Sequence, residues 1–208
     1  MVRLLIIISR YVLVLLSALF SFISFKCIKD TNKKQNSYII LQRLLMYLIH
    51  FILFAIIYLY SENINIIIFY IAQVVFFVLL NVITKKLYRN YHKALLNLMS
   101  FMLMIGFAII TRISYNKGIR QFIICIFAAL ITLAIPKIME KSKKIRNYSY
   151  LFGIFGIGAL ALVYVIGNVT SGAKLSIDLK VITIQPSEFV KISFVLFLSG
   201  ILYRYKGL

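Results

Sequence analysis

Long apolar runs, separated by short basic or polar segments, recur from one end of this 208-residue chain to the other. About 20 consecutive apolar residues cross the hydrocarbon core of a bilayer as an α-helix. Hydrophobic residues make up 62% of the chain and charged residues only 14%, and no polar stretch is long enough to fold as a separate water-soluble domain. The sequence therefore predicts an all-α protein, a polytopic integral membrane bundle of about seven transmembrane helices.

Seven apolar runs are long enough to be candidate spans. They are Leu4–Phe25, Leu44–Tyr60, Ile64–Thr84, Leu95–Ile113, Phe122–Pro136, Tyr148–Gly167 and Pro186–Tyr203. The run Phe122–Pro136 is short enough to lie partly at the membrane interface, so six spans is the alternative count. We expect the first run to be a span and not a cleavable signal peptide, because lysines and no small-x-small cleavage site follow it.

The basic residues alternate between the connecting segments, and this alternation predicts the orientation, since positive charge is retained in the cytoplasm during insertion. One side collects sixteen: Lys26, Lys29, Lys33, Lys34, Arg43, Lys85, Lys86, Arg89, Lys93, Lys137, Lys141, Lys143, Lys144, Arg146, Arg204 and Lys206. The other collects seven: Arg3, Arg10, Arg112, Lys117, Arg120, Lys174 and Lys180. We therefore expect an external amino terminus and an external segment 168–180.

The formal net charge of +19 is explained by this membrane topology, and we expect no nucleic-acid binding, because the loops are too short to build a solvated basic face. Cys27 and Cys125 lie in or beside apolar runs without CxxC spacing, and His50 and His92 are isolated from one another. The sequence thus predicts no metal site, no disulfide and no cofactor. We interpret His50 as a helix-packing residue and His92 as a solvated one.

The ionisable residues most clearly drawn into an apolar run are Glu188 and Lys191, in the segment that begins at Gln185. Residues three apart are neighbours on a helix, so the carboxylate and the ammonium can pair, which lowers the cost of holding them at membrane depth. Pro186 suits the first helical position, and Glu188 then falls in the first turn, where the helix dipole favours an anion. A helix start with a snorkelling lysine explains the same residues equally well.

The order of these residues is similar to a known family. Gly172-Ala173-Lys174, then Ile177-Asp178-Leu179, then Gln185-Pro186-Ser187-Glu188-Phe189-Val190-Lys191 resembles the SEDS family, which comprises the FtsW, RodA and SpoVE proteins of bacteria. Its members typically show a Gly-Ala-x-Arg-Trp loop and then Gln-Pro-Ser-Glu-x-x-Lys opening the next helix. Met104-Ile-Gly-Phe, Arg120-Gln121 and Ile135-Pro136 extend the resemblance upstream, so that it covers about Leu95 to Leu208.

The resemblance implies a function and a location. Family members are glycosyltransferases of the bacterial cytoplasmic membrane that polymerise lipid II into peptidoglycan during division, elongation or sporulation. They usually work with a class B penicillin-binding protein. By position, Gln185, Pro186, Ser187, Glu188 and Lys191 carry over as a substrate-binding or structural motif, with Gly172 and Ala173 shaping the external loop. Leu175-Ser176 replace the usual Arg-Trp pair, and Lys174 could partly substitute as a phosphate contact.

The resemblance also implies a division of the chain. Residues 1–93 would form three additional amino-terminal helices, and residues 94–208 the first four core helices of the family. In the family the catalytic aspartate lies in a long external loop beyond the second half of the bundle, so the resemblance implies a position downstream of Leu208. Asp178 is no equivalent. On this interpretation the chain is part of a longer glycosyltransferase. The alternatives are a transporter that flips lipid-linked precursors, and a non-catalytic membrane partner of a penicillin-binding protein.

Overall fold

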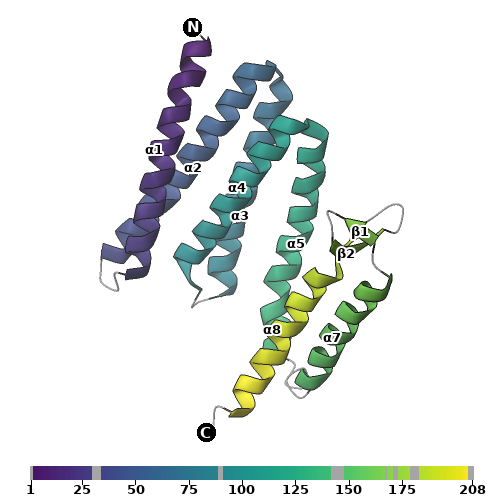
Figure 1. Cartoon of the computed structure of the whole chain (residues 1–208). Coiled ribbons are helices and arrows are strands. Elements are labelled where there is room, and N and C mark those ends of the chain that lie inside the picture. The colour runs from purple at the N-terminus through teal and green to yellow at the C-terminus, as the bar shows by residue number, and fades with distance from the viewer. Residues whose placement is uncertain are drawn as a thin grey trace. The chain divides into compact units, whose positions relative to one another are not determined.

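The computed structural model describes residues 2–29, 34–88, 91–141, 148–166, 168–170, 173–178 and 183–205. In these ranges the chain forms helices almost throughout (Figure 1). The helices are α1 (Val2–Lys29), α2 (Lys34–Ser61), α3 (Ile64–Leu87), α4 (Lys93–Ile113), α5 (Tyr115–Lys141), α7 (Ser149–Ile166) and α8 (Pro186–Tyr205). The prediction of an all-α membrane bundle is confirmed.

Each of the seven predicted spans falls on one of these helices. The first five helices are long and apolar enough to cross a membrane, and α7 is a shorter apolar helix. Helix α8 has 20 residues. Seven of the basic residues used to predict the orientation lie outside the described ranges: Lys33, Arg89, Lys143, Lys144, Arg146, Lys180 and Lys206.

Most helices extend beyond their apolar runs, and α2 and α5 extend the furthest. Helix α2 begins at Lys34, so the prediction that Arg43 belongs to the first loop is wrong. Helix α5 continues through Pro136 to Lys141, so the predicted end of the span Phe122–Pro136 is not the end of the helix. Hydropathy marks only the part of a helix inside hydrocarbon, whereas backbone hydrogen bonding continues into the polar interface; a proline removes one such bond and here does not end the helix.

The chain divides into two compact units, residues Met1–Leu133 and Ala134–Leu208. In the first unit, α1 to α5 run alternately up and down (Figure 1). The carboxy-terminal ends of α1 and α3 therefore lie at one end of this unit, and those of α2 and α4 lie at the other. This arrangement matches the alternation of basic residues along the sequence, while the assignment of either end to the cytoplasm stays a prediction.

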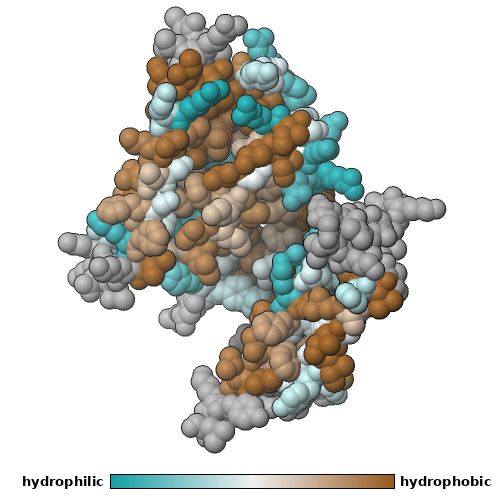
Figure 2. Space-filling model, in the orientation of Figure 1, coloured by the Kyte–Doolittle hydropathy of each residue, from teal (hydrophilic) through white to brown (hydrophobic). Residues whose placement is uncertain are grey.

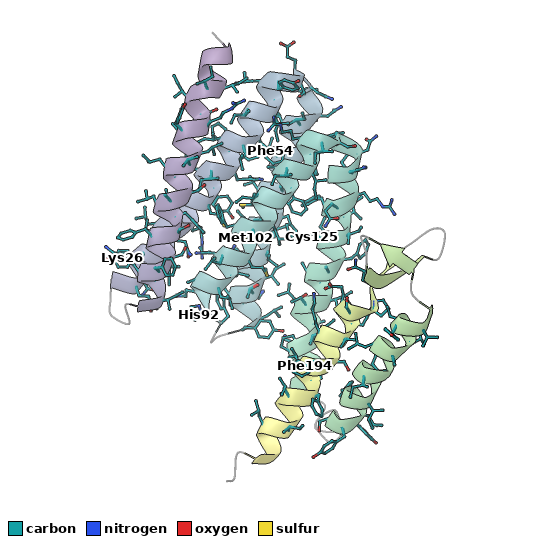
Figure 3. All side chains as sticks on the ribbon, viewed as in Figure 1. Lys26, Phe54, His92, Met102, Cys125 and Phe194 are labelled. Atoms are coloured by element: carbon teal, nitrogen blue, oxygen red, sulfur yellow. The ribbon has the colours of Figure 1, made fainter. Side chains whose placement is uncertain are left out.

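The core of the first unit is aromatic. Phe20 of α1 stacks on Phe101 of α4 with ring centroids 3.9 Å apart. The ring of Phe122 on α5 meets Phe69 and Phe107 edge to face at 5.5 and 5.6 Å. Such pairs add favourable ring electrostatics to dispersion, which is the main packing force between helices in lipid. Phe54 of α2, labelled in Figure 3, is 3% exposed and meets the ring of Phe69 at 6.2 Å.

A buried polar cluster joins α1, α2 and α4. Gln42 Nε2 donates to Ser24 Oγ at 2.9 Å, and Asn97 Nδ2 donates to Gln42 Oε1 at 3.1 Å and to the Ile39 carbonyl at 3.2 Å. Arg43 Nε donates to Asn97 Oδ1 at 3.4 Å. Hydrogen bonds between helices satisfy groups that lipid cannot, so this cluster fixes how the three helices meet. Arg43 thus has a packing role that its charge alone did not reveal.

The two histidines contribute to the packing and capping of helices. His50 of α2 is fully buried, and its Nε2 lies 3.0 Å from Gln73 Oε1 on α3. His92 precedes α4, where its Nδ1 accepts a hydrogen bond from the Leu95 amide at 3.3 Å and so caps the helix. The interpretation of His50 as a helix-packing residue is confirmed. His92 is exposed, as expected, and also serves as a cap.

The second unit contains α7, α8 and a small antiparallel sheet between them in sequence. Strands β1 (Asn168–Thr170), β2 (Ala173–Asp178) and β3 (Thr183–Ile184) are ordered β1-β2-β3. Val169 pairs with Lys174, and Ile177 pairs with Ile184. Long apolar side chains cover much of the visible surface of the described helices (Figure 2), as expected for helices in contact with lipid.

Candidate functional site

The candidate site lies at the start of α8. The helix begins at Pro186, the position predicted for this proline, and the Glu188 amide donates to the Gln185 carbonyl at 3.1 Å. Proline at the first helical position sacrifices no hydrogen bond, because the first amides of a helix have no partner within it. Glu188 falls in the first turn, where the positive end of the helix dipole stabilises its carboxylate.

Glu188 and Lys191 form the expected ion pair. Lys191 Nζ lies 2.8 Å from Glu188 Oε1, and the two side chains are 70% and 59% exposed, respectively. An exposed pair at this helical spacing contributes only about 0.3–0.5 kcal/mol to stability in water. So small a gain in stability does not explain why two charged residues occur in an apolar helix. Both side chains are exposed and can contact a further group.

Helix α8 is attached to α7 by a different face. Ser193 of α8 is buried, and its hydroxyl donates to the Phe152 carbonyl of α7. Gly156 of α7 lies against Val190 and Ser193, and Gly153 lies against the ring of Phe197. Small residues at a helix crossing let two backbones approach closely, which is how helices associate in lipid. The contact face of α8 therefore contains Val190, Ser193 and Phe197.

The ion pair points away from this contact. Successive residues of an α-helix are rotated by about 100°, which places Glu188 and Lys191 roughly opposite the face of Val190, Ser193 and Phe197. The packing of α8 on α7 consequently holds the helix while the charged face stays open within the second unit. Charges on an open face of a membrane helix are costly unless they lie at the interface or meet a polar group.

An apolar groove runs along the flank of the same two helices. Its volume is about 410 Å³, and its lining includes Phe189 and Ile192 of α8 with Leu151 and Phe155 of α7. Phe189 directly follows Glu188, and Ile192 directly follows Lys191. The start of α8 therefore combines a charged pair with a neighbouring groove whose surface is almost entirely hydrocarbon. A molecule that joins a polar head to a long apolar chain has the same two parts, one polar and one hydrocarbon.

The remaining predicted site residues are partly described. The backbones of Ala173 and Lys174 belong to β2, and β2 contacts both α7 and α8. Ser187 is half-buried beside Pro186, and Gln185 is exposed. Gly172 lies outside the described residues. Residues 168–180 were expected to form an external loop. The described parts of this segment instead pair as strands, which the polar composition did not reveal.

Sequence reasoning missed the residues that hold the site in place. Gly153, Gly156 and Ser193 carry no charge and lie in apolar runs, so they gave no chemical signal. The spacing of the two glycines could have identified them, because residues three apart share a helix face and small residues there favour a close crossing.

Comparisons with known proteins agree with the family resemblance found in the sequence. The family model for FtsW, RodA and SpoVE, described as "Cell cycle protein", matches residues 90–207. A protein of Thiomicrospira cyclica named "Probable peptidoglycan glycosyltransferase FtsW" is 35% identical over 81 residues. The match covers 39% of this chain and 19% of that protein, so the chain aligns with about a fifth of its relative's length. No solved structure matches the chain.

The family match covers more than half of the chain and includes α4, α5, α7 and α8. With the membrane-length helices it identifies a multi-pass protein of the bacterial inner membrane. The chain belongs to the FtsW/RodA/SpoVE family of cell cycle proteins.

Proposed function

We propose that the chain is part of a peptidoglycan glycosyltransferase that polymerises lipid II at the outer face of the bacterial inner membrane. The observation that carries the proposal is the Glu188–Lys191 pair on the open face of α8, beside an apolar groove. Lipid II joins a charged diphosphate to a polyprenyl chain, and the start of α8 offers a cation and a hydrocarbon surface to those two parts. Family membership and the name of the Thiomicrospira cyclica relative support the same activity.

In this proposal Lys191 contacts the diphosphate and Glu188 holds the ammonium in place. A lysine is a compact cation suited to a phosphate oxygen, and a neighbouring carboxylate restricts its rotamers. Lys174 in β2 is a second candidate for phosphate contact. Gln185, Pro186 and Ser187 set the start of the helix, and Ala173, in β2, belongs with Gly172 to the segment proposed to be external. The base that activates the acceptor hydroxyl would be an aspartate supplied from outside residues 1–208.

We further propose that residues 94–208 form the first four core helices of the family fold and that residues 1–93 add three helices. Packing groups the helices differently, because α4 contacts α1 and α2 within the first unit. The added helices would therefore be a platform for α4 and not a separate domain. A class B penicillin-binding protein is the proposed partner, since family members usually act with one.

The test is a polymerisation assay on the full-length gene product, purified with its penicillin-binding protein and supplied with fluorescent lipid II. We expect glycan strands from the unmodified protein and a rate lowered by about 100-fold in K191M, the scale of losing one preorganised electrostatic contact in a transition state. K137M removes an exposed lysine of α5 and serves as the charge-matched control, with an unchanged rate expected.

Two results would contradict the polymerase proposal. Movement of labelled lipid II across vesicle membranes without any glycan growth would assign the groove to a transporter. Absence of both activities, together with stable co-purification of the penicillin-binding protein, would make the chain a non-catalytic partner.

A further inference from the structure

A second cavity lies in the first unit, away from the Glu188–Lys191 motif in sequence. Its volume is about 750 Å³, and α1, α2 and α4 form its walls with the α2–α3 and α4–α5 connections. Side chains of Leu13, Leu53, Ile57 and Ile105 line its apolar part. The volume lies within the range of about 300–1,000 Å³ that is typical of small-molecule sites.

Two arginines line the same cavity. Arg10 belongs to α1 and Arg112 to the last turn of α4, and both are exposed. Asn63 and Tyr115 add polar groups to the lining. Glu62 is an acidic residue directly before the cavity residue Asn63 in the sequence. Among the described residues, however, no carboxylate forms an ion pair with Arg10 or Arg112. The cavity thus has an apolar interior and two unpaired guanidinium groups.

We propose that this cavity binds an anionic glycerophospholipid of the membrane leaflet at the end of the first unit where α2 meets α3. The phosphate lies between Arg10 and Arg112, and one acyl chain enters the apolar part along Leu53 and Ile105. A guanidinium matches a phosphate with two parallel hydrogen bonds and is always charged. The orientation predicted from basic residues makes this the external leaflet.

Charge complementarity distinguishes this occupant from ordinary lipid contact. A helix surface that only faces acyl chains needs no cation, whereas two unpaired arginines beside an apolar cavity favour an anionic head over a zwitterionic one. The arginines come from α1 and α4, so the bound lipid would also link a helix of residues 1–93 to a helix of the family region. This inference does not depend on the proposed polymerase activity.

The chain offers a direct reporter for the test, because it contains no tryptophan. Tyr60 lines the cavity and is 85% exposed, so Y60W introduces a single fluorophore with little change in shape. Acyl-brominated phosphatidylglycerol and phosphatidylcholine with identical chains are titrated into the purified full chain in detergent, and quenching is recorded. F25W, at a 74% exposed position of α1 that does not line the cavity, reports general lipid contact.

We expect phosphatidylglycerol to quench the Y60W reporter at lower concentration than phosphatidylcholine, with no such preference for F25W. R10Q and R112Q should each reduce this preference about fivefold, the effect of one basic residue on an anionic lipid. The matched control is K117Q/R120Q, which removes two exposed charges of α5 outside the cavity lining and should preserve the preference.

Three outcomes would overturn the proposal. The first is equal quenching by both lipids at the Y60W reporter. The second is an equal loss of preference in K117Q/R120Q, which would indicate general charge attraction. The third is full competition by soluble glycerol phosphate at the concentration of the lipid, which would mean that the arginines bind a free phosphate and the apolar cavity takes no part. Far-ultraviolet circular dichroism confirms that each variant is folded.

Discussion

Gly153 of α7 faces the ring of Phe197 on α8 so closely that a Cβ atom at residue 153 would lie 2.8 Å from Cδ2 of that ring. Gly156, one turn later on the same helix, is different: an added Cβ would meet Val190 Cγ1 at 3.6 Å, an ordinary contact. The two glycines therefore make unequal demands on the crossing of α7 and α8, although both lie on its contact face.

We expect G153A to destabilise the second unit by about 1–3 kcal/mol, because the aromatic ring must move away from a packed position. G156A should change stability little or raise it slightly, because alanine favours the helix and fits the available space. Unfolding in mixed micelles, followed by circular dichroism, measures both variants. Equal effects at the two positions would show that the crossing is looser than described.

N97A tests the polar cluster of the first unit. Removing the Asn97 amide leaves the buried Gln42 Oε1 without a donor and takes away the second donor to the Ile39 carbonyl, which lies inside α2 and keeps its helical hydrogen bond. Hydrogen bonds between membrane helices average about 0.6 kcal/mol, and stranded buried groups cost more, so we expect a loss of about 1–2 kcal/mol. M102A, at a position of α4 that is 64% exposed, is the control and should stay close to the unmodified protein in the same unfolding assay.

The charge swap E188K/K191E separates a structural pair from a functional one. The swapped residues can still form an ion pair, and the lysine in the first turn costs about 0.3–1 kcal/mol against the helix dipole. We expect normal protein levels and near-normal thermal stability, together with a loss of glycan polymerisation as large as in K191M. Recovery of polymerisation in the swap would mean that the pair only stabilises the start of α8.

Accessibility of introduced cysteines tests the orientation. In a C27A/C125A background, N116C at the α4–α5 end and N36C at the start of α2 place single thiols at opposite ends of the first unit. We expect a membrane-impermeant maleimide to label N116C in intact spheroplasts and N36C only after lysis. The reverse pattern would invert the orientation and move the proposed lipid site to the cytoplasmic leaflet.

Hydropathy predicted which segments are helical, because each span must satisfy its own backbone in lipid. It failed at helix ends, because Arg43 is charged yet lies well inside α2, and Pro136 lies inside α5. Neither a charge nor one missing amide is sufficient to stop a helix when the backbone groups on both sides are hydrogen-bonded. Helix ends depend on capping and tertiary contact, as with His92 before α4. These contacts are not visible in average hydropathy.

The motif Gln185 to Lys191 was predicted from the sequence because its chemistry is local: a proline, a first-turn acid and a lysine three residues later define one helix start. The cavity lined by Arg10 and Arg112 could not be predicted in this way. Its two arginines are about a hundred positions apart and meet only because α1 and α4 pack in the same unit.

The cluster around Asn97 has a consequence for biosynthesis. Chains enter the membrane from the amino terminus, so α1 and α2 leave the translocon before α4 arrives. The two acceptors of the Asn97 amide, Gln42 and the Ile39 carbonyl, are then already in the membrane when α4 enters it. Without these acceptors the amide would face lipid unpaired. The first two helices would in this way act as an intramolecular chaperone for α4, and the order of helices along the gene would itself be part of the folding mechanism.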